Sequence, residues 1–223
     1  MSLRAVGGID LWVEEGGRKG GPTLLLMHGL SGTGDIWNGL REILDKKWPG
    51  RWVIPDMRGH GRSAHSDMYG IANHAADMAA LVADTDDLYL AGHSMGGLVG
   101  ILMASGWFGV RPRAVVTAGV KVAWTDEEIA GIAKLIDMPV RWFDTEADAR
   151  ERFILVTGLK GVADPESEFA STGVVEDDGR WRLAADNRAA AVAYADTQDI
   201  YRAARAPVVL AAGEHDRMVS AED

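Results

Sequence analysis

Residues 88–104 read LYLAGHSMGGLVGILMA, in which an apolar strand pattern leads into the pentapeptide GHSMG at 92–96. The small and apolar residues that follow are typical of a helix packed closely against its neighbours. A serine in a G-x-S-x-G turn between a strand and a helix indicates an exposed nucleophile. Gly92 and Gly96 leave space in a turn where a Cβ would collide, and the helix start favours developing negative charge. We therefore interpret Ser94 as the candidate nucleophile.

The bulk composition is that of an ordinary globular protein. The chain has 223 residues, no cysteine and a formal net charge of −10, and its length fits one α/β domain with an insertion. The acidic balance disfavours nucleic acid and anionic membranes as partners. No apolar run approaches the roughly 20 residues of a membrane-spanning helix, and the first residues lack the apolar stretch of a signal peptide. Without cysteine there are no disulfides and no thiol catalysis, which fits a cytoplasmic protein.

Short apolar runs alternate with helical patterns along the chain. We expect strands at 9–13, 23–27, 52–55, 88–91, 114–118 and 207–212. Apolar residues recur at helical spacing in 36–47 and 72–83, which predicts helices there. This alternation is typical of a mostly parallel sheet with helices on both faces.

The pattern changes between residues 121 and 190. This stretch is charged and favours helices at 126–135 and 146–156, and a further helix is expected at 186–204. Residues 176–182 favour a turn and a short hairpin, so we interpret the acidic run 176–178 as solvated rather than as a metal site. We expect residues 1–120 and 191–223 to form the core of the fold, and 121–190 to form an inserted lid.

Four motifs resemble those of the alpha/beta-hydrolase family, and each follows an expected strand. They are HGLSG at 28–32, DMRGHGRS at 56–63, GHSMGG at 92–97 and GEHDRMV at 213–219. Their order and their spread over nearly the whole chain make the resemblance specific for the fold, but not for a substrate. The resemblance implies an α/β-hydrolase fold with a helical lid insertion.

The resemblance also implies roles for individual residues. Ser94 would attack the acyl carbon, and Asp216 would orient a catalytic histidine. The backbone N–H groups of Leu30 and Met95 would hold the oxyanion. Trp124 follows the expected strand at 114–118 and is the one aromatic residue of the lid that we assign to the substrate pocket. No metal and no cofactor are implied, because serine acyl transfer needs neither.

The catalytic histidine has no evident position in the sequence. The family order is serine, acid, histidine, and no histidine follows Asp216. The six histidines are His28, His60, His65, His74, His93 and His215. We expect none of them to be the base, because histidines outside a matched catalytic role are mostly scaffold residues. We therefore expect the chain to be truncated before a final strand, the catalytic histidine and a last helix.

Two functional hypotheses remain from the sequence. The first is a serine hydrolase of carboxylic esters or lactones, and the same triad in this family also supports carbon–carbon bond hydrolysis and perhydrolysis. The second is a non-catalytic small-molecule-binding protein in which the missing base is genuine. A dinucleotide-binding domain is disfavoured, because residues 28–34 lack the G-x-G-x-x-G spacing. Both hypotheses imply a small-molecule ligand, and both leave its identity and the oligomeric state open.

Overall fold

The computed structural model describes residues 1–216 and 219, which form one large sheet, its covering helices and a separate hairpin. In chain order the elements are β1 (Ser2–Val6), β2 (Ile9–Gly17), β3 (Thr23–Met27), the 3-10 helix η1 (Gly34–Trp37), α1 (Asn38–Lys47), β4 (Arg51–Pro55), α2 (Ile71–Leu81), β5 (Leu88–His93), α3 (Met95–Met103), β6 (Ala114–Ala118), α4 (Asp126–Ile136), α5 (Glu146–Val156), α6 (Glu168–Thr172), β7 (Val174–Asp177), β8 (Arg180–Leu183), the 3-10 helix η2 (Asn187–Tyr194), α7 (Thr197–Ala203) and β9 (Val208–Ala211).

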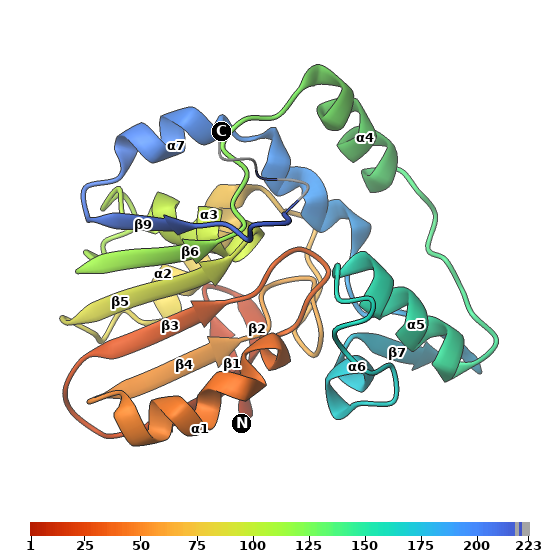
Figure 1. Cartoon of the computed structure of the whole chain (residues 1–223), viewed down its shortest axis with the longest axis horizontal. Helices are drawn as coiled ribbons and strands as arrows, with labels where there is room; N and C mark the ends of the chain where they lie inside the picture. The colour runs from red at the N-terminus through yellow and green to blue at the C-terminus, as the bar shows by residue number, and fades with distance from the viewer. Residues whose placement is uncertain (217–218, 220–223) are drawn as a thin grey trace.

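Within the described residues, the large sheet has seven strands in the order β1-β2-β4-β3-β5-β6-β9. The β1–β2 and β2–β4 pairs are antiparallel, and the remaining pairs are parallel. Parallel strands bring their carboxyl ends to one edge of a sheet, where ligand sites form. In Figure 1 this edge faces the segment that contains α4, α5 and α6.

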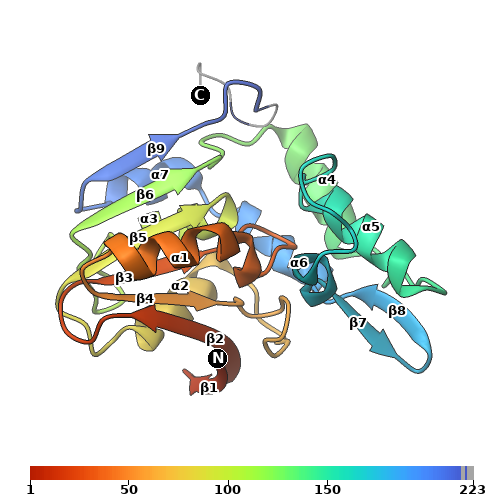
Figure 2. The same ribbon diagram turned by 60° about the horizontal axis from the view of Figure 1, so that its bottom comes forward.

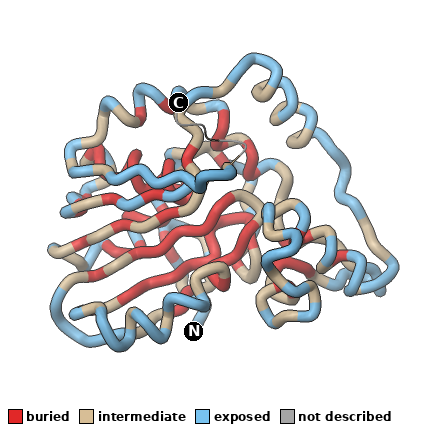
Figure 3. Tube along the Cα trace, in the orientation of Figure 1, coloured by how far each residue is buried: buried red, intermediate tan, exposed pale blue. Residues whose placement is uncertain are grey.

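Helices cover both faces of the sheet, as Figures 1 and 2 show. On one face, α1 lies over β3 and β4, where Leu26, Trp52 and Ile54 form a buried cluster. On the other face, α2, α3 and α7 enclose the main core, which includes Leu25 and Val53. Neighbouring residues of β3 and β4 therefore pack on opposite faces, and Figure 3 shows these strands buried along most of their length. Their uninterrupted apolar sequence follows from this two-sided burial.

Most expected elements are found, two expectations need correction, and two elements were not expected. The strands expected at 23–27 and 114–118 are confirmed at their bounds. The strand expected at 9–13 continues to residue 17, because β2 is hydrogen-bonded to β1 on one side and to β4 on the other. The sequence did not reveal β1, nor the short helix α6.

The single helix expected at 186–204 is wrong. A 3-10 helix, η2, ends at Tyr194, and α7 starts only at Thr197. Asp196 lies between them in an extended conformation, and its side chain accepts a hydrogen bond from the Asp199 N–H. An aspartate that caps a new helix in this way ends the preceding one.

The segment that holds α5, α6, β7 and β8 has a small core of its own. Ala149, Phe153, Ile154, Ala170 and Val174 form this core, separate from the core beneath the sheet. By contrast, Val192 in η2 and Ile200 in α7 already pack into the main core. The division into a core of 1–120 and 191–223 and a lid of 121–190 stays a prediction. No helix in the described part of the chain is long and apolar enough to cross a membrane.

Candidate active site

A sharp turn joins β5 to α3, and Ser94 lies at its apex. Ser94 has φ 49° and ψ −117°, an unusual conformation for a residue with a side chain, which costs on the order of 1–3 kcal/mol. Two backbone hydrogen bonds hold it: the Ser94 N–H donates to the Ala118 carbonyl at 2.8 Å, and the Leu98 N–H donates to the Ser94 carbonyl at 3.1 Å. Strain maintained by its surroundings is a common feature of functional sites.

The glycines on either side of Ser94 are required by close backbone packing. A Cβ on Gly92 would lie 2.4 Å from the backbone nitrogen of Gly97, within the same turn. A Cβ on Gly96 would lie 2.5 Å from the Met27 carbonyl oxygen at the end of β3. Neither neighbour is a flexible side chain that could move aside. The steric reason for glycine at both positions is therefore confirmed.

The loop at 28–32 packs directly against this turn. A Cβ on Gly29 would lie 3.3 Å from the Ser94 Cβ. Gly29 therefore packs against the turn, and Leu30 is the next residue in the chain. Met95 is the first residue of α3, and the first N–H groups of a helix have no partner within it. The structure thus brings the segments of Leu30 and Met95 beside Ser94. Their role as oxyanion donors stays a prediction.

His28 joins the loop at 28–32 to the loop that follows β4. Its Nε2 accepts a hydrogen bond from the Met57 N–H at 2.9 Å, which leaves Nδ1 to donate to the Gly29 carbonyl at 2.8 Å. Burial lowers the pKa of His28, so the imidazole is neutral at pH 7. Both ring nitrogens of His28 are therefore hydrogen-bonded to backbone groups.

A buried carboxylate, Asp56, ties the same two loops together. It accepts hydrogen bonds from the backbone N–H groups of Gly34 and Arg62, and from the Arg62 guanidinium at 2.7 Å. Arg62 also reaches Asp35. Burial alone would raise the pKa of Asp56, but the hydrogen bonds and charge of Arg62 outweigh it and lower this pKa. Asp56 is thus an ionised scaffold group that fixes the loop beside Ser94.

Asp216 lies beyond β9, at the same sheet edge as the carboxyl ends of β5 and β6. Its Oδ2 would be 3.4 Å from a Cβ on Gly119, and the His93 Nε2 would be 3.6 Å from the same Cβ. Gly119 follows β6, has φ 64°, and donates its N–H to the Ala211 carbonyl at 2.9 Å. Asp216 and His93 therefore face one another across Gly119, at the edge that holds Ser94.

The His93 imidazole lies near enough to the candidate acid to feel its charge. Burial lowers the pKa of His93, and the charge of Asp216 partly opposes this. Its Nδ1 is shielded from solvent and has no hydrogen-bond partner among the described residues. A Cβ on Gly29 would lie 2.7 Å from that nitrogen. Sequence reasoning missed this arrangement, although His93 ends β5 and Asp216 follows β9, two strands that end at one edge.

Trp124 lies in the connection between β6 and α4. Its ring is 5.5 Å from the Lys121 ammonium, which pairs with Glu128 at 2.9 Å. Thr125 and Glu128 form the capping box that starts α4. Trp124 thus lies beside Lys121 and directly before the N-cap of α4. Its assignment to a substrate pocket stays a prediction.

Among the residues that the structure describes, no three or more histidine, aspartate or glutamate side chains are grouped so that they could hold an ion. The acidic run at 176–178 covers the end of β7 and the start of the turn before β8, and its residues are exposed.

Comparison with known proteins gives the family. Residues 24–223 match the model of the "Alpha/beta hydrolase family", and the chain belongs to that family. Similar solved structures include E-2-(acetamidomethylene)succinate hydrolase, with a TM-score of 0.81 and 23% identity over 99% of this chain and 83% of that one. A thioesterase domain from the curacin biosynthetic pathway has a TM-score of 0.80 and 20% identity over 100% of this chain and 85% of that one. At these identities the structures establish the fold alone.

Curated relatives match shorter stretches. Lipase LipV of Mycobacterium tuberculosis is 28% identical over 182 residues, which cover 78% of this chain and 67% of the relative. The magnesium-chelatase 30 kDa subunit of Rhodobacter capsulatus is 34% identical over 105 residues, which cover 45% of this chain and 36% of the relative. The matched part of the chain thus spans only about a third to two thirds of the length of these two relatives.

Proposed function

We propose that this member of the alpha/beta hydrolase family is a serine hydrolase that cleaves carboxylic esters or lactones through an acyl-enzyme on Ser94. The observation that carries the proposal is the strained turn between β5 and α3, with Ser94 at φ 49° and glycines packed against backbone on both sides. A turn of this form holds a serine oxygen out from the sheet edge, at the start of a helix.

The proposed reaction has two stages. The Ser94 oxygen bonds to the carbonyl carbon while its proton passes to a base, and the alcohol leaves with that proton. Water then repeats the sequence on the acyl-enzyme and releases the acid. The Leu30 and Met95 N–H groups hold the negative oxygen in both stages. Loss of such a donor lowers kcat by about 10²–10³-fold.

Asp216 is the proposed acid, and the sequence holds no histidine after it to act as the base in the order that the resemblance implies. The described histidines are poorly suited to the role. His28 and His60 are fully buried with lowered pKa values, because burial disfavours their charged forms. His93 is half-buried and faces Asp216, so it is the described histidine that most needs a direct test.

The substrate class rests on the relatives' names and on the proposed lid. The name of lipase LipV supports an ester substrate. The proposed lid, residues 121–190, would close over the sheet edge, and Trp124 at its start would line the pocket. Hydrolysis of carbon–carbon bonds and perhydrolysis use the same groups and remain within the proposed class. The expectation of a cytoplasmic protein stays a prediction.

The alternative is a non-catalytic protein that binds a small molecule at the same edge. The observation in its favour is that three histidines, His28, His60 and His74, are fully buried and none is placed as an evident base. The two functions differ in what Ser94 contributes. In the hydrolase Ser94 is needed for turnover, whereas in the binding protein it is one contact among several.

Steady-state kinetics with p-nitrophenyl esters of increasing acyl length and with γ-lactones separate these functions. We expect turnover of at least one substrate and a loss of at least about 10³-fold in kcat for Ser94→Ala. His93→Gln tests the described histidine nearest to this role: a loss as large as that of Ser94→Ala would assign the base to His93, and unchanged activity would exclude it. If turnover is absent while calorimetry detects binding that Ser94→Ala leaves intact, the binding function replaces the hydrolase.

A further inference from the structure

A third extended segment, at Phe143, pairs with β8 of the β7–β8 hairpin. The Phe143 N–H donates to the Trp181 carbonyl at 2.7 Å, and the Trp181 N–H donates to the Phe143 carbonyl at 2.8 Å. Residues that exchange both hydrogen bonds point to the same face of a sheet. Phe143 and Trp181 therefore share one face, and their neighbours in sequence lie on the other.

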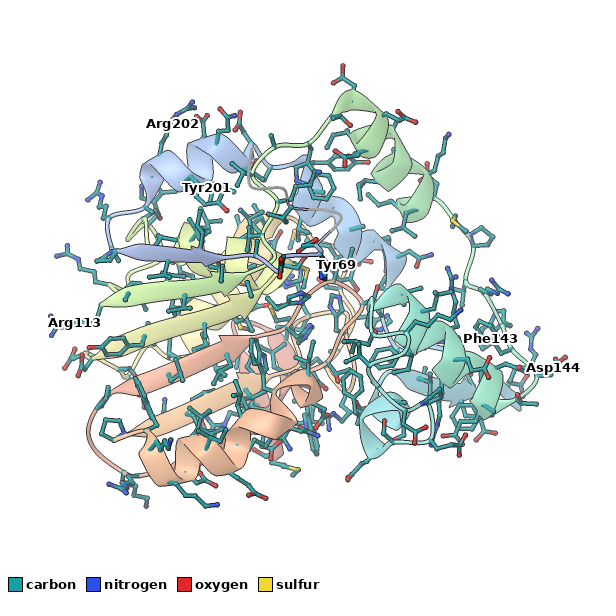
Figure 4. The ribbon with its side chains drawn as sticks, viewed as in Figure 1. Tyr69, Arg113, Phe143, Asp144, Tyr201 and Arg202 are labelled. Atoms are coloured by element: carbon teal, nitrogen blue, oxygen red, sulfur yellow. The ribbon has the colours of Figure 1, made fainter. Side chains whose placement is uncertain are left out.

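The two faces of this small sheet differ in character. Phe143, Trp181 and Leu183 pack against the core around Phe153. Trp142, Arg180 and Arg182 lie on the opposite face, and we call these three residues the arginine–tryptophan face. The hairpin projects away from the main sheet (Figure 2). Figure 4 places Phe143 and Asp144 at the end of the molecule opposite Arg113.

Both arginines of this face lie over the same indole ring. The Arg180 guanidinium carbon is 4.7 Å from the Trp142 ring centroid, and that of Arg182 is 6.0 Å from it. Among the described residues, neither guanidinium has a carboxylate within ion-pairing distance, although Asp177 lies opposite Arg180 across the hairpin. Two positively charged guanidinium groups thus lie over one indole ring, in a chain whose formal net charge is −10.

We propose that the arginine–tryptophan face is a docking surface for an extended acidic segment of a partner protein. Arginine forks bind carboxylates with paired hydrogen bonds, and arginine and tryptophan are the residues that most often dominate protein interfaces. Arg180 and Arg182 are two apart on one strand, so their Cα atoms are separated by roughly 6.6 Å. A partner segment with the pattern Glu-x-Glu in extended form presents two carboxylates at the same spacing.

The surroundings of the face favour a short acidic segment over a nucleic acid. Asp144, Asp177 and Asp178 are exposed beside it, and they would repel phosphates that continue past the two arginines. A peptide avoids this repulsion when its flanking residues are basic. The proposal therefore specifies two central carboxylates between lysines or arginines. It is independent of the proposed hydrolysis, because the face lies outside the site around Ser94.

Fluorescence anisotropy tests the proposal with the labelled peptide Lys-Gly-Glu-Gly-Glu-Gly-Lys. We expect it to bind the wild-type chain at low salt, more tightly than the counterpart with glutamine at both glutamate positions. The double variant Arg180→Gln/Arg182→Gln should weaken binding by about tenfold, because two charge pairs with the peptide carboxylates are lost. The double variant Arg111→Gln/Arg205→Gln removes the same charge at two other exposed arginines and should bind as the wild type does.

Three results would overturn the proposal. The first is equal binding of the glutamate and glutamine peptides. The second is an equal loss of binding in both double variants, since that would reflect overall charge rather than this face. The third is wild-type self-association in sedimentation velocity that Arg180→Gln/Arg182→Gln abolishes, since the occupant would then be a second copy of the chain. Circular dichroism of each variant checks that the fold is retained, because Arg182 is half-buried and its guanidinium donates to the Leu183 carbonyl at 3.1 Å.

Discussion

Two regions of the molecule are held together by different kinds of contact: the first is the main sheet with the loops and helices around Ser94, and the second is segment 121–190, which holds the cluster around Phe153. Around Ser94, glycines allow backbone to touch backbone, as where Gly96 lies against the end of β3. Around Phe153, a small apolar cluster is surrounded by exposed charged residues and arginine–aromatic pairs. The first region tolerates almost no change in shape, whereas the second can change most of its surface without loss of packing.

This difference separates chemistry from recognition in the molecule. A reaction centre needs atoms held within a fraction of an ångström, which backbone packing and buried hydrogen bonds provide. Binding surfaces need side chains that vary while the scaffold stays constant. We therefore place the proposed reaction in the first region, and the proposed specificity and partner contacts in the second.

The largest stability effect is expected from a buried ion pair in the first region. Arg58 and Asp77 form two hydrogen bonds at 2.6 and 2.7 Å, and both side chains are almost fully buried. Asp77→Ala leaves the Arg58 charge buried without its partner and should lower the unfolding free energy by about 3–5 kcal/mol. Urea denaturation measures this. The matched change Glu146→Gln, at the half-exposed pair with Arg150 in α5, should cost less than about 1 kcal/mol, and equal costs would refute the contrast.

The second effect in size is expected from acid, which should lower the unfolding free energy through buried histidines of the first region. His28, His60 and His74 form a row of neighbouring rings, and burial lowers all three pKa values, that of His60 to about 3. In the unfolded chain these histidines titrate near their ordinary pKa of about 6.5. Between these values the unfolded chain binds more protons, so the unfolding free energy falls as pH drops.

Stability should therefore be complete above about pH 7 and decline below 6.5, with His60 alone contributing a loss of about 2–3 kcal/mol at pH 4.5. Urea denaturation at pH 8, 6 and 4.5 measures the decline. His60→Gln cannot titrate in this range, so its stability should depend less steeply on pH. A wild-type stability that stays constant from pH 8 to 4.5 would show that these histidines are not held neutral by burial.

The smallest effects are expected from matched glycine-to-alanine substitutions, which should change the stability of the two regions in opposite directions. Gly96→Ala places a Cβ against the Met27 carbonyl and should destabilise the chain by about 1–3 kcal/mol. Gly131, inside α4, has nothing within 4 Å of an added Cβ, so Gly131→Ala should stabilise that helix by about 0.5–1 kcal/mol. Thermal unfolding followed by circular dichroism reports both changes. A stabilising Gly96→Ala would contradict the close packing on which the comparison rests.

The sequence predicts the first region well because its motifs encode backbone requirements. A glycine that must touch a carbonyl, such as Gly96, appears in the sequence as part of a short recognisable pattern, and buried strands such as 23–27 appear as uninterrupted apolar runs. The predicted elements and their order follow from these local signals, and the alpha/beta hydrolase family is confirmed.

Contacts between distant segments could not be predicted in the same way. His93 and Asp216 face one another only because β5, β6 and β9 end at one edge, and no local pattern in either segment encodes that meeting. Trp142 contacts Arg180 and Arg182 only because residue 143 pairs with β8. The break between η2 and α7 depends on Asp196, a capping residue that an alanine-rich stretch conceals.

The central claim is that Ser94 is an activated nucleophile, and covalent labelling tests it most directly. The wild-type chain and Ser94→Ala would be treated with an alkyl fluorophosphonate and measured by intact-mass spectrometry. We expect a single adduct on the wild type, located on Ser94 by peptide mapping, and none on Ser94→Ala. An unlabelled wild-type chain, or an adduct that persists in Ser94→Ala, would contradict the claim.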